Sequence, residues 1–385
     1  MAKSRVALLL ALLLAINPLE ASALHSLDKY VNSKHLATPG LLILNPLDGQ
    51  VIAQNAPESL RVPASVLKLV SSTAALHFVG GERRYVTTIF TTEKENTYLI
   101  KGSLDPWMTS NLTLAKKNGQ KYLPSLISKA NPENKKRLTI YYSSLFEKDR
   151  YDLNLNLKRK GIKATFKKVD AAKAKEIAKE EIASLTSPPL SEMIKFVNLY
   201  SDNTLANRLA MAAAREIGFE RTSKGLTQTF KLALEEIGVN SQGLKAKDGS
   251  GLDKANRLST QTVVELLVKI KDNPKYQAIY EGLPVAGKSG TLKKRFIEDG
   301  PEAVGKVKAK TGWLRNTVTL AGYAKSADKE YVFAIMADGI TPTLSSRNKA
   351  RAAMDRLLEC FERHGSHSSI FGRDRQGSAG PFGWL

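Results

Sequence analysis

Strand-like segments at both ends of the chain, separated by helical ones, are the feature that most constrains the fold. Two apolar runs, 41–44 and 51–54, flank the turn-forming stretch 45–49, which is typical of a hairpin. Later strand-like segments are 307–311, 317–324 and 331–337. Helical periodicity between them covers 190–200, 203–217, 222–237 and 259–271. These patterns predict an α+β fold, in which both ends of the chain share one antiparallel sheet with helices packed around it.

The texture changes between residues 82 and 184, which predicts an inserted α+β domain. Its strand-like segments are 84–92, 97–101 and 138–142. Residues 170–183 are rich in Ala, Lys and Glu and are expected to form an exposed helix. Pro188 and Pro189 mark the return to the main domain, which is predicted to comprise residues 24–81 and 185–363, with a final helix over 344–363.

The two ends are expected to lie outside these domains. Residues 1–23 resemble a secretory signal, with Lys3 and Arg5 before an apolar stretch and small residues at its end. Residues 364–385 are rich in Gly and Ser and lack periodicity, so a disordered tail is expected. The signal predicts secretion across the inner membrane, to the periplasm or the cell envelope.

Composition narrows the range of partners. The formal net charge is +21, and its densest run lies within 158–168. A solvated surface is the favoured interpretation, and peripheral contact with anionic envelope polymers or a membrane surface is the alternative. No zinc knuckle or aromatic-rich RNA motif supports a nucleic-acid partner. Cys360 is the only cysteine, and no His-x-x-x-His or Cys-x-x-Cys pattern occurs, so no metal site is predicted.

Ser65 and Lys68 stand at the start of an apolar helical pattern. Their spacing places both side chains on one face of a helix, one turn apart, and Pro63 suits a helix start. A lysine held out of water has a lowered pKa and can accept a serine proton. Ser-x-x-Lys occurs four times in the chain, so this pattern is weak by itself. The alternative is a helix start followed by a lysine that reaches solvent.

Two further motifs follow in order. Ser201-Asp202-Asn203 joins two helical patterns, and Lys310-Thr311-Gly312 lies on a strand-like stretch. Residues 346–348 and 288–290 also fit these patterns, but they do not match both the order and the structural context. Asp202 is expected to cap the helix that follows it.

The ordered triple Ser-x-x-Lys, Ser-x-Asn and Lys-Thr-Gly resembles that of penicillin-binding proteins and serine β-lactamases. Longer stretches are similar to the low-molecular-mass class C penicillin-binding proteins, which are D-alanyl-D-alanine carboxypeptidases and endopeptidases. These stretches are 60–69, 187–192 with 201–203, 248–252 with 256–259, 283–287 with 290–292, and 308–312 with 320–323. The resemblance implies the penicillin-binding-protein/serine β-lactamase-like transpeptidase fold, an antiparallel sheet flanked by helices.

The resemblance also implies a set of site residues. It implies that the catalytic residues would be Ser65, Lys68, Ser201, Asn203 and Lys310, and that the substrate-binding residues would be Thr311, Gly312 and Trp313. Ser65 would attack the carbonyl between two D-alanines, with Lys68 or a Ser201/Lys310 relay as the base. Backbone N–H groups of Ser65 and Trp313 would form the oxyanion hole. The implied partners are peptidoglycan stem peptides as substrate and β-lactams as inhibitors, and no cofactor is implied.

The sequence departs from the family pattern in two places. The stretch between Lys68 and Ser201 is shorter than usual, because most members insert two extra domains there and this chain keeps one. Trp313 follows Lys-Thr-Gly where a small or hydroxyl residue is commoner. Two alternatives to the carboxypeptidase remain open: a serine β-lactamase on the same scaffold, and a catalytically silent protein that binds envelope polymers.

Overall fold

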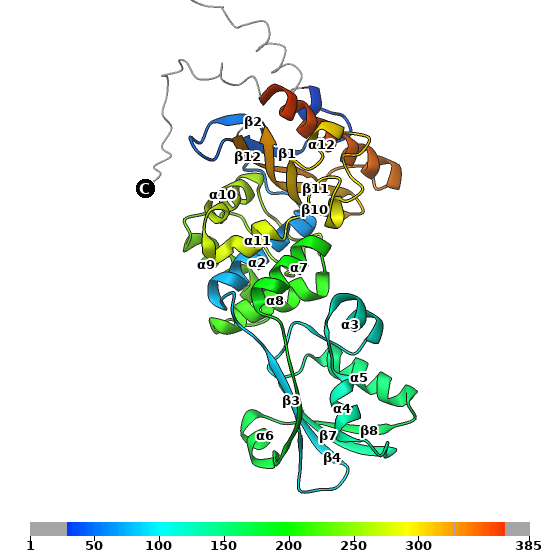
Figure 1. The fold of residues 1–385 in the computed structure, drawn as a ribbon. Coiled ribbons are helices and arrows are strands. Elements are labelled where there is room, and N and C mark those ends of the chain that lie inside the picture. Colours follow the sequence, from blue (N-terminus) through cyan, green and yellow to red (C-terminus); the bar gives the residue numbers. More distant parts are fainter. Residues whose placement is uncertain (1–28, 327–328, 366–385) are drawn as a thin grey trace, which may run out of the picture.

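The chain forms two lobes joined by two adjacent chain segments (Figure 1). A computed structural model describes residues 29–326 and 329–365. The larger lobe contains both ends of the described chain. The smaller lobe is built from one stretch in the first half of the chain, residues 86–186. The predicted signal segment 1–23 lies outside the described residues, as does nearly all of the predicted tail. The last helix ends at Gly365, two residues beyond its expected end at 363.

The sheet of the larger lobe has five strands in the order β10-β11-β12-β1-β2. Their bounds are β1 Gly40–Leu44, β2 Val51–Asn55, β10 Val307–Leu314, β11 Thr317–Ser326 and β12 Lys329–Ala337. Strand β1 pairs antiparallel with β12, with Gly40 opposite Met336 and Leu44 opposite Val332. The prediction that both ends of the chain share one antiparallel sheet is therefore confirmed.

Helices cover both faces of this sheet. On one face lie α2 Leu67–Phe78, α7 Leu190–Tyr200, α8 Asn203–Glu216, α9 Ser223–Glu235, α10 Thr260–Lys271 and α11 Gln277–Glu281. Helix α2 is buried from Leu67 to Leu76, because neighbouring helices surround it. Its apolar residues therefore join a core with side chains from α7 to α11 and from the sheet. On the other face, α12 Leu344–Gly365 packs residues such as Leu357 and Phe361 against the sheet.

The smaller lobe has a second five-stranded sheet, in the order β8-β7-β4-β3-β9. Its strands are β3 Val86–Thr91, β4 Thr97–Lys101, β7 Arg137–Ser143, β8 Lys163–Lys168 and β9 Glu181–Thr186. Its helices are α3 Leu112–Asn118, α4 Pro124–Ala130, α5 Glu147–Arg159 and α6 Ala171–Ile177. Two short strands, β5 Met108–Thr109 and β6 Lys121–Tyr122, form a separate parallel pair in the same lobe. The sheet is mixed, since β7 runs parallel to β4 and β8. The lobe has its own apolar core.

One helix prediction is wrong in its second half. The expected helix over 170–183 ends at Ile177, and residues 181–186 form strand β9. Strand β9 pairs antiparallel with β3, from Val86 opposite Thr186 to Ile89 opposite Ala183. The backbone hydrogen bonds of this pairing outweigh the modest helix propensity of a segment rich in Ala, Lys and Glu.

A buried ion pair fastens the smaller lobe to α8. The Arg208 Nη2 donates to the Asp149 Oδ1 at 2.6 Å, and both side chains are nearly fully buried. The Arg208 Nη1 also donates to the Met108 carbonyl at 2.9 Å, and the guanidinium lies 4.4 Å from the centroid of the Phe146 ring. A single α8 side chain therefore contacts two separate segments of the smaller lobe, one at Met108 and one at Phe146 and Asp149.

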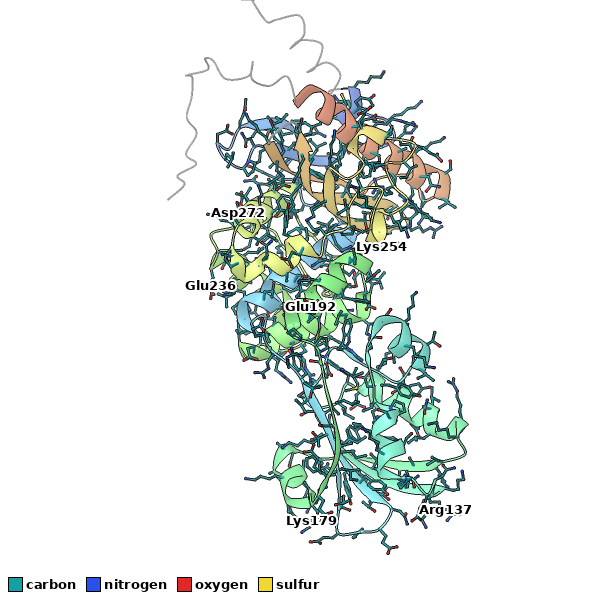
Figure 2. The ribbon with its side chains drawn as sticks, in the orientation of Figure 1. Arg137, Lys179, Glu192, Glu236, Lys254 and Asp272 are labelled. Carbon is teal, nitrogen blue, oxygen red and sulfur yellow. The ribbon has the colours of Figure 1, made fainter. Side chains whose placement is uncertain are left out.

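The surface carries much of the positive charge. The cations of the 158–168 run lie at the end of α5 and along β8, and all of them are exposed. In Figure 2, Arg137 and Lys179 lie at the far end of the smaller lobe, whereas Lys254 and Glu192 lie on the larger one. Among the helices that the structure describes, none is long and apolar enough to cross a membrane.

Candidate active site

Ser65 lies in a short 3-10 helix, Ala64–Val66, that continues into α2. Pro63 precedes this turn, as expected for a residue without an N–H. Ala64 has φ of 45°, in the left-handed region that a residue with a Cβ rarely adopts. The chain is held in this conformation by tight packing, because a Cβ on Gly251 would meet the Ala64 carbonyl oxygen at 1.8 Å. A strained backbone therefore presents the Ser65 hydroxyl.

Lys68 lies one turn further along and is completely buried. Its Nζ donates to three oxygens: Ser65 Oγ at 2.8 Å, Asn203 Oδ1 at 2.7 Å and the Ser250 carbonyl at 2.7 Å. Burial lowers the pKa of Lys68 to about 7, although the charges of Asp248 and Asp202 oppose the shift. At neutral pH much of this amine is therefore uncharged and can accept a proton from Ser65.

Ser201 and Lys310 form a second serine–lysine pair. Ser201 is the C-cap of α7, with φ of 60°, again in the left-handed region. Lys310 is on β10, and its Nζ donates to Ser201 Oγ at 2.8 Å and to the Thr311 carbonyl at 3.0 Å. Burial, followed by the charge of Lys68, lowers the pKa of Lys310 well below its usual value.

A loop from Asp248 to Asp253 holds the Ser250 carbonyl against Lys68. The Asp248 carboxylate accepts from the backbone N–H groups of Ser250 at 2.7 Å, Gly251 at 2.6 Å and Asp253 at 2.7 Å. Burial by itself would raise the pKa of Asp248, but these hydrogen bonds hold it below its usual value. Asp248 therefore shapes the loop. Asp202 caps α8 by accepting from the Leu205 N–H at 2.8 Å, as predicted.

Ser65, Ser201 and the Lys310-Thr311-Gly312 segment open onto one cleft of about 330 Å³. It is lined by Ser65, Ser201, Asn203, Thr291, Arg295, Thr311, Gly312, Trp313, Val318 and Arg351. Thr311 Oγ1 donates to Thr291 Oγ1 at 2.8 Å. A Cβ on Gly312 would come within 2.9 Å of the Ser65 backbone nitrogen, so glycine lets β10 approach the serine.

The structure brings every predicted site residue to this cleft or to its wall. Ser65, Ser201 and Asn203 line it together with Thr311, Gly312 and Trp313, whereas Lys68 and Lys310 are buried behind the two serines. Sequence reasoning missed Arg295 and Arg351, which carry no motif and come from distant segments. It also gave no role to Thr291, although the surrounding stretch belongs to the family resemblance.

Other candidate groups lie elsewhere. The His77 Nδ1 is 2.6 Å from the Tyr276 hydroxyl, and its Nε2 is 2.6 Å from the Glu236 carboxylate, so this histidine serves a side-chain network outside the cleft. Within residues 29–326 and 329–365, no cluster of His, Cys, Asp and Glu could hold a metal ion.

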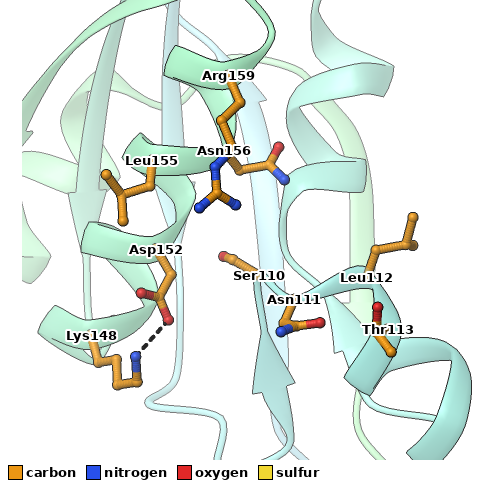
Figure 3. Close-up of a pocket in the computed structure, with 9 residues that line it drawn as sticks. All are labelled: Ser110, Asn111, Leu112, Thr113, Lys148, Asp152, Leu155, Asn156 and Arg159. Atoms are coloured by element: carbon orange, nitrogen blue, oxygen red, sulfur yellow. Dashed lines mark hydrogen bonds and ion pairs between the residues drawn. The ribbon is translucent and has the colours of Figure 1, made fainter.

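A second hollow, of about 510 Å³, lies between α3 and α5 in the smaller lobe (Figure 3). Lys148 and Asp152 form an ion pair of 2.9 Å at one side, and Arg159 extends into the opening from above. Ser110 and Asn111 form the facing wall. None of the predicted site residues lines this hollow.

The fold and the cleft together bring the Ser65/Lys68 pair, the Ser201/Asn203 segment and the Lys310-Thr311-Gly312 segment to one place. Residues 131–360 match the model of the family described as "D-Ala-D-Ala carboxypeptidase 3 (S13) family". This match spans more than half of the chain, so the chain belongs to that family.

Curated relatives agree with this family. The chain is 32% identical over 184 residues to Carboxypeptidase DacB of Mycolicibacterium smegmatis, which is 46% of this chain and 40% of that protein. It is 34% identical over 165 residues to a D-alanyl-D-alanine carboxypeptidase of an Actinomadura species, which is 42% of this chain and 30% of that protein. The chain thus matches less than half the length of these relatives.

Solved structures share the fold. Penicillin binding protein 4 from Haemophilus influenzae superposes with a TM-score of 0.70 at 17% identity, covering 88% of this chain and 99% of that one. A predatory endopeptidase from Bdellovibrio bacteriovorus, in complex with its immunity protein, gives 0.63 at 18% identity, covering 84% and 92%. The predicted fold class is confirmed by these likenesses.

Proposed function

We propose that the protein is a serine-type D-Ala-D-Ala carboxypeptidase that acts on peptidoglycan stem peptides through an acyl-enzyme on Ser65. The observation that carries this proposal is the 2.8 Å hydrogen bond between Lys68 Nζ and Ser65 Oγ, at a lysine whose pKa burial lowers to about 7. A serine becomes a nucleophile only when such a base removes its proton.

The first half-reaction follows from the positions of the two pairs. Lys68 accepts the Ser65 proton as Oγ attacks the carbonyl between two D-alanines, and the Ser201/Lys310 pair offers a second proton route. The backbone N–H groups of Ser65 and Trp313 hold the oxyanion, which the close approach of Gly312 to the Ser65 nitrogen supports. Ser201 passes a proton to the departing D-alanine amine, and the ester to Ser65 remains.

The rest of the cleft orients the substrate. Asn203 uses its Oδ1 to accept from Lys68, which leaves its amide N–H groups to donate to the amide oxygen of the stem peptide. Thr311, which lines the cleft, donates a hydrogen bond to the terminal carboxylate, and the Lys310 amine lies behind it against Ser201. Water then hydrolyses the ester and regenerates Ser65. A β-lactam, which mimics the dipeptide, acylates the same hydroxyl.

Location and domain organisation belong to the same proposal. We propose that residues 1–23 direct export to the periplasm or cell envelope, where the peptidoglycan substrate is found. We propose that residues 82–184 form an inserted domain, which Arg208 fixes against the catalytic domain. Endopeptidase action on cross-linked stems is part of the proposal, and the assay below separates it from carboxypeptidase action.

The lining of the cleft disfavours a β-lactamase. Fast hydrolysis of a penicilloyl ester needs a group that activates water, and a carboxylate commonly serves this purpose. The described residues that line the cleft include two arginines and no carboxylate. We therefore expect the penicilloyl adduct to persist.

Labelling with a fluorescent penicillin tests the proposal. Wild type, Ser65→Ala and Lys68→Ala are compared, with Ser346→Ala as a control that removes the serine of another Ser-x-x-Lys pattern. We expect a lasting adduct on the Ser65 peptide by mass spectrometry, lost in the first two variants and kept in the third. Linear and cross-linked muropeptides then separate carboxypeptidase from endopeptidase activity.

The other outcomes are informative. Rapid penicillin turnover without a lasting adduct would favour the β-lactamase. Neither adduct nor turnover would overturn the catalytic proposal and leave binding of envelope polymers as the leading alternative.

A further inference from the structure

Arg351 reaches the active-site cleft from α12, far from the three catalytic motifs in the sequence. Its side chain lines the same cleft as Ser65, Ser201 and Thr311. The guanidinium lies 5.0 Å from the centroid of the Trp313 ring, against which it packs. A partly buried cation is therefore presented to the space that the substrate would occupy.

Arg295 fixes the segment that carries Arg351. The Arg295 guanidinium pairs with the Asp355 carboxylate through its Nε and Nη2, and both side chains are buried. The same Nη2 also donates to the Arg351 carbonyl at 3.2 Å. Because these bonds join α12 to the 290–300 segment, the backbone of Arg351 is held in place before any ligand arrives.

The charges around Arg351 do not balance. Arg295, Arg347 and Arg351 gather here, whereas Asp355 is the one acid among the described residues that act on Arg351, and it is already paired with Arg295. Arg347 packs on the same Trp313 ring and donates to the neutral carbonyls of Thr343 and Leu314. Burial and the charge of Arg295 lower the pKa of Arg351, so an anion in the cleft would relieve an unfavourable environment.

The neighbouring residue on β10 offers little to such an anion. Trp313 follows Lys310-Thr311-Gly312, and its indole supplies no hydroxyl beside Thr311. Its ring instead supports the two arginines of α12. The planar, permanently charged guanidinium of Arg351 is suited to bind both oxygens of a carboxylate.

We propose that Arg351 forms a carboxylate-binding subsite at the α12 side of the cleft and binds the terminal carboxylate of the substrate, together with Thr311. This inference rests on the proposed acylation of Ser65. It assigns recognition of a C-terminal carboxylate to a residue outside the three motifs, with Arg295 and Trp313 as its positioning residues.

The test compares one scaffold with and without its carboxylate. Acylation of the purified protein is measured with benzylpenicillin and with its neutral methyl ester, for wild type, Arg351→Ala and Arg351→Lys. Lys349→Ala is the matched control, because it removes one positive charge from an exposed position of the same helix. Intact-protein mass spectrometry gives the second-order acylation constant for each probe.

We expect wild type to favour the acid over the ester. Arg351→Ala should lower the constant for the acid by about tenfold to a hundredfold and leave that for the ester within about twofold. Arg351→Lys should retain part of the preference, because it keeps the charge and loses the bidentate geometry. Lys349→Ala should match wild type with both probes.

Each contrary result has one meaning. Equal losses for acid and ester in Arg351→Ala would overturn the subsite, because they would show general damage to the cleft. An unchanged constant for the acid in that variant, or no acid preference in wild type, would overturn it as well. Failure of both probes to acylate wild type would instead overturn the proposed function, on which the subsite depends.

Discussion

Lys310 and Lys68 are both completely buried behind the same cleft, and burial, followed by the charge of Lys68, lowers the pKa of Lys310. Each lysine donates to its own serine at 2.8 Å, Lys68 to Ser65 and Lys310 to Ser201. Two neighbouring ammonium groups out of water would repel each other strongly. The site therefore favours states in which Lys68 and Lys310 are not both protonated. Each lysine can therefore exchange a proton with its serine at neutral pH.

The acylation rate should therefore rise with pH through the pKa of Lys68. Burial lowers this pKa to about 7, and only the neutral amine can accept the Ser65 proton. We expect the second-order constant for penicillin acylation to increase between about pH 6 and pH 8 and then level off. Stopped labelling across this range, with circular dichroism as a check on folding, measures it. A flat profile, or a rise centred above pH 9, would contradict the base assigned to Lys68.

Gly251 should be essential for the position of Ser65. It has φ of +81°, and a Cβ there would meet the Ala64 carbonyl oxygen at 1.8 Å. Gly251→Ala should cost roughly 2–4 kcal/mol of unfolding free energy and reduce acylation of Ser65. Urea denaturation and penicillin labelling measure the two effects.

Gly49→Ala is the matched control for that substitution. Gly49 has φ of +72° on an exposed turn, and a Cβ added there would meet nothing within 4 Å. We expect a cost of about 1 kcal/mol and unchanged acylation. Equal effects at the two glycines would show that the left-handed φ, and not contact with Ala64, is what matters.

The Arg208–Asp149 pair should couple the two lobes energetically. Arg208→Met leaves the Asp149 carboxylate buried without its cation, which should destabilise the protein by about 3–5 kcal/mol. Adding Asp149→Asn should recover part of this loss, because the unpaired charge is removed. A double-mutant cycle by urea denaturation measures the coupling. Arg356→Ala, which breaks an exposed pair with Asp299, should cost less than about 1 kcal/mol.

Asp105 should make stability depend on pH in an unusual direction. Burial raises the pKa of this carboxyl to about 7, and its Oδ2 has no hydrogen-bond partner. Between about pH 4 and pH 7 the folded chain keeps a proton that the unfolded chain has lost, so this group's contribution to stability falls as pH rises.

Asp105→Asn tests this pH dependence. The amide keeps an oxygen to accept from the Trp107 N–H and carries no charge. The variant should exceed wild type by on the order of 2–4 kcal/mol at pH 8 and equal it near pH 3.5. Denaturation at several pH values measures the difference, and a constant difference across the range would contradict the raised pKa.

The sequence by itself determined the local structure and the spacing within each motif. Turn chemistry at 45–49 predicted the β1–β2 hairpin, and the i, i+3 spacing of Ser65 and Lys68 placed them one helical turn apart. Helical periodicity placed α7 to α10 to within two residues. These features depend on interactions between near neighbours in the chain, which the pattern of residues records directly.

Tertiary structure alone decided the chemistry of the cleft. Burial, which no motif records, lowers the pKa values of Lys68 and Lys310. Strand β9 forms where local propensity favoured a helix, because its backbone pairs with β3 by hydrogen bonds. Arg351 reaches Trp313 only because α12 packs across the sheet that carries β10. Desolvation and long-range pairing depend on residues far apart in the chain, so they become visible only when the chain is folded.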